Sequence, residues 1–165
     1  MKQLVLIRHT KSDWSNFSLR DYDRPIKESR KQDATNMAKH LYKLGLQPDG
    51  IICSPALRTK QTAKLLCKGL KFDFEKIVFD ERLYESSAED YMAVIQEVVA
   101  VVNTLVVIGH NPSITYFANK YANVQIDDVP TTGVVWLEFS GKDWLLSKSD
   151  KSRLKHFFTP SSVSE

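Results

Sequence analysis

Apolar and polar residues follow one another along this chain in blocks that predict strands separated by helices. Four short apolar runs show no polar alternation, which is typical of strands buried on both faces of a parallel sheet. The runs are residues 4–7, 51–53, 77–79 and 105–108. Two further strands are expected at residues 134–139 and 144–146, with a turn at "SGKD" between them.

Stretches with apolar residues at helical spacing lie between these runs. They predict helices at residues 34–44, at about 56–68, at 91–102 and in a short segment after Pro112. Gly45 and Gly69 mark the expected ends of the first two helices. The alternation of strands and helices predicts an α/β protein, a three-layer α/β/α sandwich whose sheet is mostly parallel with an antiparallel edge strand.

The length and composition are those of one globular domain. A chain of 165 residues is long enough to bury a substantial core. We expect a single domain over residues 1–160 and a flexible tail at 161–165. Two cysteines make no disulfide framework, the start resembles no signal peptide, and no apolar run approaches the roughly 20 residues of a membrane helix. A cytoplasmic protein without a membrane partner is therefore the expectation.

Positive charge is concentrated near the amino end, although the net charge of the whole chain is only +3. A solvated protein face is the commoner explanation of such a cluster, and an anionic partner is the alternative. A nucleic-acid partner is not expected, because the overall charge is mild and no stacking aromatics are convincingly interleaved with the basic residues. The cluster consists of Lys11, Arg20, Arg24, Lys27, Arg30 and Lys31.

Two of the expected strand ends carry arginines that suit an anion. Arg8 and His9 follow the first apolar run directly, at the sheet edge where ligands bind in α/β proteins. After the second run, Ser54 and a proline are expected to start a helix, with Ser54 as its cap. Arg58 then lies about one turn inside, close to a helix end that favours anions. The alternative for Arg58 is a surface arginine beside a good cap.

A histidine, His110, follows a third strand end. Gly109 permits a tight turn before it, and an Asn-Pro pair after it resembles the helix start of the second segment. A lone histidine at such a place is more often structural than chemical. Because parallel strands end at one sheet edge, however, we expect His110 to meet His9 and the two arginines.

Two arginines, two histidines and helix amino ends together suit a phosphoryl group. Arginine forks match phosphate oxygens in bidentate geometry, and fixed cations stabilise the charge that builds up in the transition state. A histidine can attack phosphorus through a neutral ring nitrogen, since its unperturbed pKa of roughly 6.5 leaves much of it neutral near pH 7. No metal or other cofactor is then required.

The same residues form a family pattern. The strings "RHTKSDW", "DYDRP", "CSPALRTKQTA" and "VIGHNP" occur in this order and resemble the histidine phosphatase superfamily, which includes cofactor-dependent phosphoglycerate mutase. The chain is most similar to the small bacterial branch typified by the phosphohistidine phosphatase SixA, from residue 2 to about residue 160. The resemblance implies a phosphoglycerate mutase-like fold and a metal-independent phosphatase with a phosphate-bearing substrate.

The resemblance also implies roles for individual residues. His9 would be the nucleophile that becomes phosphorylated, and water would then release phosphate. Arg8, Arg58 and His110 would bind the phosphoryl oxygens of the substrate. Phosphohistidine or another phosphoprotein, such as a phosphorylated histidine protein, is the preferred substrate. A small-molecule phosphomonoesterase and a non-catalytic phospho-ligand binding module are the alternatives.

Other positions match the family less clearly. Glu85 best fits the acid that protonates the leaving group in the wider superfamily, with Glu81 as a poorer match, although Glu85 near a helix start equally suits the helix dipole. Arg30 stands where the small branch usually has glycine. Long insertions that cover the site in sugar-phosphate members have no room here, which favours an open site and a phosphate on a protein surface. Trp14 and Phe17 are expected to form one wall of the substrate approach or part of the core.

Three rival chemistries fit the residues less well. Cys53 shares a segment with Arg58, as in cysteine phosphatases, but the spacing is one residue shorter than that phosphate-binding loop needs. Ser54 as a hydrolase nucleophile lacks the G-x-S-x-G elbow. A metal site built from the two histidines and Asp13 has no recognisable ligand spacing.

Overall fold

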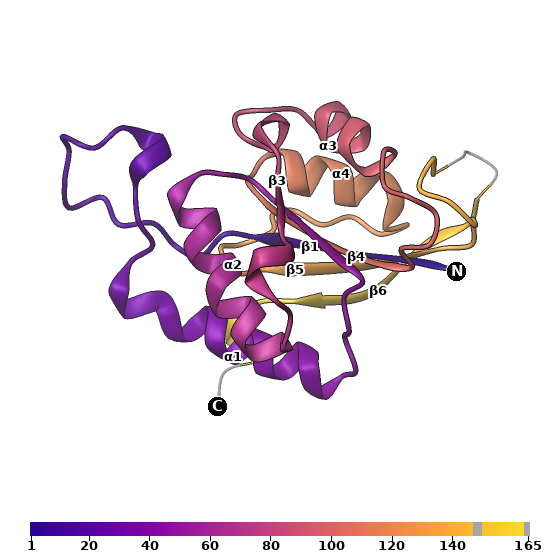
Figure 1. Ribbon diagram of the computed structural model, residues 1–165, viewed down its shortest axis with the longest axis horizontal. Helices are drawn as coiled ribbons and strands as arrows, with labels where there is room; N and C mark the ends of the chain where they lie inside the picture. The colour runs from indigo at the N-terminus through magenta and orange to yellow at the C-terminus, as the bar shows by residue number, and fades with distance from the viewer. Residues whose placement is uncertain (147–149, 164–165) are drawn as a thin grey trace.

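One six-stranded sheet forms the centre of the computed structural model (Figure 1), which describes residues 1–146 and 150–163. The strands are β1 (Lys2–Arg8), β2 (Gly50–Cys53), β3 (Val78–Phe79), β4 (Thr104–Gly109), β5 (Val134–Phe139) and β6 (Ser152–Phe158). Their order is β3-β2-β4-β1-β5-β6. Strands β1 to β4 pair in parallel, β5 is antiparallel to β1, and β6 is antiparallel to β5. The predicted α/β fold with a mostly parallel sheet and an antiparallel edge is confirmed.

Helices cover both faces of the sheet and complete three layers (Figure 1). Helices α1 (Lys31–Lys43) and α2 (Leu57–Leu70) pack together on one face. Helices α3 (Ala88–Ile95) and α4 (Ser113–Tyr121) pack together on the other. The short helix α5 (Pro160–Val163) contacts α1. Within the described residues, no helix is long and apolar enough to cross a membrane.

The central strand β1 shows why the predicted strands lack polar alternation. Successive side chains of a strand point to opposite faces of the sheet. Leu4 and Leu6 pack in the cluster beneath α3 and α4, while Val5 and Ile7 pack in the cluster beneath α1 and α2. Each fully buried aliphatic side chain contributes about 1.5–3 kcal/mol. A strand with helices on both faces therefore needs apolar residues at every position.

The first two helices end differently from one another. Gly45 follows α1 with φ of +90°, which confirms it as the helix stop. Gly69 does not close α2, because the helix continues to Leu70 and the residue after it, Lys71, adopts the left-handed conformation.

Arg30 lies in the one-turn 3-10 helix Glu28–Arg30 before α1, and its Nε is 2.9 Å from a carboxylate oxygen of Asp33.

The third helix is shorter than predicted. Helix α3 ends at Ile95, and the chain continues through turns in place of the helix expected to residue 102. Val98 and Val102 pack partly against the core, but Val99 and Val101 are 64% and 80% exposed. The apolar residues after α3 thus do not share one helical face, and their β-branched side chains disfavour a helix.

The strand predicted at residues 144–146 is wrong. Trp144 is buried and donates its indole N–H to the carbonyl of Val102, while Leu146 adopts φ of 49°, which a strand does not allow. The antiparallel edge strand is β6 instead, where polar and basic residues are mixed with apolar ones and no residue is fully buried. Strand β6 lies at the edge of the sheet and, among the described strands, pairs only with β5. Its faces are less covered than those of a central strand, so no apolar run marks it in the sequence.

Part of the expected tail, residues 161–163, lies in the short helix α5, and its flexibility stays a prediction. Residues 160–163 form α5, and Val163 packs against the core cluster beneath α1. Residues 164 and 165 of the predicted tail lie outside the described residues.

We expect Gly69→Ala to destabilise the protein. In most helix interiors the same substitution is stabilising, because alanine is more favourable there than glycine by about 1 kcal/mol. A Cβ at Gly69 would lie 2.4 Å from the Cβ of Ala38 on α1, so the two helices must separate. The expected loss is about 1–3 kcal/mol in urea unfolding.

Two further variants control this experiment. The double variant Gly69→Ala with Ala38→Gly removes the clash and is expected to recover part of the lost stability. Gly50→Ala, whose Cβ would meet its nearest side-chain atom at 3.7 Å, should leave stability almost unchanged. Unfolding midpoints that are the same for Gly69→Ala and wild type would contradict this packing.

Candidate active site

The predicted phosphoryl-binding residues line one pocket of about 360 Å³ at the carboxyl edge of the sheet. Arg8 ends β1, His9 follows it, Arg58 lies in the first turn of α2, and His110 follows β4. The four side chains come from three separate parts of the chain, as the sequence predicts. The complete lining is Arg8, His9, Lys11, Ser12, Trp14, Asp21, Arg58, His110, Asn111 and Thr131.

The register of β1 and β4 brings the two histidines together. Arg8 lies opposite Gly109 in this parallel pair, so the residues after them leave the sheet side by side. The backbone N–H of His9 donates to the carbonyl of Gly109 at 3.1 Å, and the ring centroids of His9 and His110 are 5.3 Å apart. A Cβ at Gly109 would lie 2.1 Å from the hydroxyl of Tyr91. Close packing, more than turn freedom, requires the glycine.

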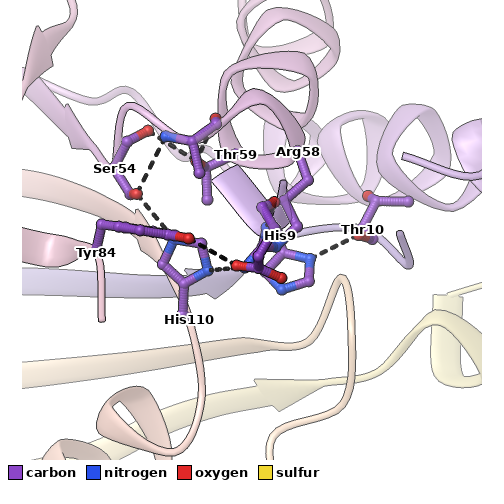
Figure 2. Close-up of polar contacts among 9 residues, drawn as sticks. His9, Thr10, Ser54, Arg58, Thr59, Tyr84 and His110 are labelled. Atoms are coloured by element: carbon purple, nitrogen blue, oxygen red, sulfur yellow. Dashed lines mark hydrogen bonds and ion pairs between the residues drawn. The ribbon is translucent and has the colours of Figure 1, made fainter. Parts of the chain in front are cut away.

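The ring of His9 has a defined tautomer. Its Nδ1 lies 2.7 Å from the carbonyl oxygen of Thr10 (Figure 2). A carbonyl only accepts, so Nδ1 carries the proton and Nε2 keeps a lone pair. Burial lowers the pKa of His9 to about 4, and the charges of Arg58 and Arg8 act in the same direction. His9 is therefore neutral near pH 7, the state in which it can attack phosphorus.

The ring of His110 is oriented by two neighbours. Its Nδ1 lies 3.4 Å from Nη2 of Arg58, and its Nε2 lies 2.8 Å from Oγ of Ser54 (Figure 2). A guanidinium only donates, so Nδ1 accepts and the Nε2–H donates to Ser54. Burial, together with the nearby His9 and Arg58, lowers the pKa of His110 to about 3.

Ser54 therefore has a different role from the predicted one. Helix α2 begins at Leu57, with Ala56 at its N-cap position and no side-chain cap. Ser54 is fully buried and its hydroxyl contacts His110 and, at 3.4 Å, the backbone N–H of Ala56. The serine supports the histidine of the pocket in place of capping the helix.

Asp21 and Tyr84 are site residues to which the sequence analysis gave no role. The guanidinium of Arg58 donates to the backbone carbonyl of Asp21 at 2.8 Å and to its carboxylate at 3.0 Å. Tyr84 donates its hydroxyl to the same carboxylate at 2.7 Å. Burial raises the pKa of Asp21, but the hydrogen bond from Tyr84 and the charge of Arg58 outweigh it and lower the pKa below its usual value. Asp21 belongs to "DYDRP", which was the available signal.

The guanidinium of Arg8 is held by contacts with Val129 and Asp128. Its Nη1 donates to the carbonyl of Val129 at 2.9 Å and lies 3.8 Å from a carboxylate oxygen of Asp128. Its Nε is buried without a hydrogen-bond partner in the described part of the chain. Arg8 therefore has donor capacity that its protein contacts do not use.

Of the remaining candidates, only Trp14 belongs to the pocket lining. Glu85 is exposed with φ of 48°, so its role as proton donor stays a prediction. Cys53 is fully buried, its thiol contacts the carbonyl of Ser54, and burial raises the pKa of that thiol. Such a thiol is not the nucleophile of this pocket. Trp14 lines the pocket with 55% of its surface exposed, whereas Phe17 is 87% exposed and is not part of the core.

The charge and shape of the pocket suit an oxyanion. Two guanidinium groups lie beside two neutral imidazoles, and Lys11 adds a further cation to the lining of a space large enough for a phosphoryl group and part of its carrier. Across the described residues, no group of three or more His, Cys, Asp or Glu side chains is arranged to hold a metal ion.

Comparisons with known proteins agree with this geometry. Residues 4–100 match the sequence model of the histidine phosphatase superfamily (branch 1). An uncharacterized chloroplastic protein of Arabidopsis thaliana is 29% identical over 151 residues, which cover 87% of this chain and 69% of that protein.

Solved structures show the same fold. A protein of Agrobacterium tumefaciens assigned as the phosphohistidine phosphatase SixA superposes with a TM-score of 0.81 at 24% identity, over 96% of this chain and 98% of that one. A mycobacterial glucosyl-3-phosphoglycerate phosphatase superposes with a TM-score of 0.67 at 16% identity, over 94% and 97%. The sequence match and the arrangement of the pocket agree, and the chain belongs to the histidine phosphatase superfamily.

Proposed function

We propose that this chain is a metal-independent phosphatase that passes the phosphoryl group through a covalent intermediate on His9. The observation that carries the proposal is the neutral ring of His9. Its Nδ1–H donates to the carbonyl of Thr10, which leaves the lone pair on Nε2. A pure phosphate-binding module would need the arginines but no nucleophile.

In the first step, the Nε2 lone pair of His9 attacks phosphorus in line with the leaving group. The N–P bond forms, the bond from phosphorus to the leaving group breaks, and the leaving group takes the electron pair together with a proton from Glu85 or from solvent. Arg8 and Arg58 offset the negative charge on the phosphoryl oxygens. The Thr10 carbonyl accepts a hydrogen bond from Nδ1–H and so stabilises the positive charge that the phosphorylated ring acquires.

In the second step, a water oxygen attacks the phosphorus of phosphohistidine. The P–O bond forms, the N–P bond breaks with its electron pair returning to Nε2, and the water proton leaves with solvent or inorganic phosphate. A bound phosphoryl group raises the pKa of His110, because an adjacent negative charge favours the imidazolium. Protonated at Nδ1, His110 then donates to a phosphoryl oxygen.

The proposed substrate is phosphohistidine or another phosphoprotein. The pocket is open, and an imidazole leaving group departs readily once it is protonated. The similarity to the SixA structure supports this class. A small-molecule phosphomonoester is the second candidate, since a mycobacterial glucosyl-3-phosphoglycerate phosphatase shares the fold.

Replacing the nucleophile should abolish turnover. We expect His9→Ala to lower kcat for p-nitrophenyl phosphate and for free phosphohistidine by about 1000-fold or more, because both ring nitrogens of the other histidine, His110, are engaged by Arg58 and Ser54. A steady-state phosphate-release assay measures this. His40→Ala, on α1 away from the pocket, is the matched control and should keep wild-type turnover. Comparable activity in His9→Ala and wild type would rule out His9 as the nucleophile.

The protonation state of His9 gives a second prediction. The lowered pKa means that Nε2 stays unprotonated from neutral pH down to about pH 5 and takes a proton only as pH falls through about 4. Histidine-selective NMR titration of the free protein should show this midpoint for His9. A midpoint near the unperturbed value of roughly 6.5 would contradict the proposed environment of the ring.

Glu85→Ala tests the proton donor. We expect kcat for an alkyl phosphate to fall more than kcat for phosphohistidine, because an alkoxide needs a proton while imidazole can take one from solvent. Glu89→Ala, an exposed carboxylate at the start of α3, is the control. Equal effects of Glu85→Ala and Glu89→Ala on both substrates would remove Glu85 from the mechanism.

A further inference from the structure

The segment between β1 and α1 stands beside the pocket and projects from the body of the molecule. Residues 11–27, which we call the strap, form most of the indigo loop at the left of Figure 1, beyond the carboxyl end of β1. Lys11, Ser12, Trp14 and Asp21 of the strap line the pocket. A carrier whose phosphoryl group enters this pocket therefore comes close to the strap.

The two ends of the strap are joined, so its shape is set before any partner binds. Ser12 and Ile26 form an antiparallel bridge. The N–H of Asp13 donates to the carbonyl of Pro25 at 2.8 Å, and the N–H of Lys27 donates to the carbonyl of Lys11 at 2.7 Å. A preset surface loses little conformational entropy on association.

The strap exposes two aromatic side chains. Phe17 is 87% exposed and Trp14 is 55% exposed. The guanidinium of Arg24 lies 3.8 Å from the centre of the Trp14 ring and donates to the carbonyl of Asn16 at 3.3 Å, next to Phe17. Single exposed apolar residues are common, but two on one preset segment at the rim of an anion pocket mark a contact surface.

The charges of the strap favour a protein over an anionic membrane. The strap carries four cations and three carboxylates, and Arg20 is paired with Asp23 at 2.9 Å. A surface that binds anionic lipid headgroups needs a large excess of positive charge. Lys11, exposed at the rim and without an ion pair in the described residues, offers one cation to a carboxylate beside the phosphoryl group.

The depth of the nucleophile points in the same direction. His9, Arg58 and His110 are only 7–8% exposed, so the phosphoryl group must project from its carrier to reach them. A phosphorylated side chain on a folded protein projects in this way while the surface around it stays at the rim. The strap is then within reach of that surface.

We propose that the strap is the docking surface for a phosphorylated protein, which contacts Phe17 and Trp14 while its phosphorylated side chain enters the pocket. The partner presents apolar side chains and at least one carboxylate around the phosphorylated residue. This inference rests on the proposed phosphatase function and specifies how the enzyme selects a protein substrate.

Paired substrates with the same leaving group test the strap. Small proteins phosphorylated on one exposed histidine by phosphoramidate form a panel, and free phosphohistidine is the comparison. We expect wild type to have a higher kcat/KM for at least one panel protein than for free phosphohistidine. Phe17→Ala should lower kcat/KM for that protein about tenfold, mainly through KM, and leave free phosphohistidine within about twofold.

Two variants serve as controls. Phe17→Leu keeps an apolar side chain and should recover part of the loss. Tyr116→Ala removes a 64% exposed aromatic on α4 and should change neither substrate. Phe17 is exposed, so a failure to fold does not confuse the result.

Three outcomes would overturn the docking surface. They are an equal effect of Phe17→Ala on both substrates, no effect on either, and no panel protein turned over faster than free phosphohistidine. Sedimentation of wild type, but not of Phe17→Ala, with phosphatidylserine vesicles would assign the strap to a membrane and also overturn it. Failure of the phosphatase function is distinct, because wild type would then turn over neither substrate.

Discussion

The hydrogen bond from Nδ1 of His9 to the carbonyl of Thr10 is the interaction on which the site depends. This hydrogen bond decides which ring nitrogen holds a lone pair, and it restrains the rotation of the imidazole ring. Burial and two neighbouring guanidinium groups keep that ring neutral. The same cations would attract a phosphoryl group, so the features that prevent protonation of His9 also favour the substrate that we propose for it.

The sheet supplies the constraint that assembles this site. Parallel pairing of β1 with β4 places Arg8 beside Gly109, and the residues that follow leave the sheet at one edge. Hydrogen bonds then hold them: the buried Ser54 orients His110, while the half-buried Asp21 and Tyr84 hold Arg58 in place. The strap, whose two ends are joined, bounds one side of the pocket.

The sequence predicts the parts of the molecule that local pattern and sheet geometry determine. Residues 4–7 of β1 and 105–108 of β4 are apolar because both faces of the sheet are covered, and the ends of the two strands place the histidines. Strand β6 and the end of α3 escape prediction, because an edge strand and a turn of β-branched residues lack such a pattern. The contacts of Asp21 and Ser54 span 37 and 56 residues of sequence, so no local signal could show them. The "DYDRP" string marked the place of Asp21 without its partner.

The position of the phosphoryl group on the enzyme tests the central claim most directly. Wild-type protein is mixed with phosphoramidate, quenched in alkali to preserve an acid-labile phosphoramidate bond, and analysed by two-dimensional proton–phosphorus NMR of the purified peptide. Phosphorus coupled to the ring protons in the pattern of an Nε2-phosphorylated His9 is the predicted result. Phosphate at Nδ1 of His9, on His110, or on an acid-stable residue would contradict the arrangement described for this pocket.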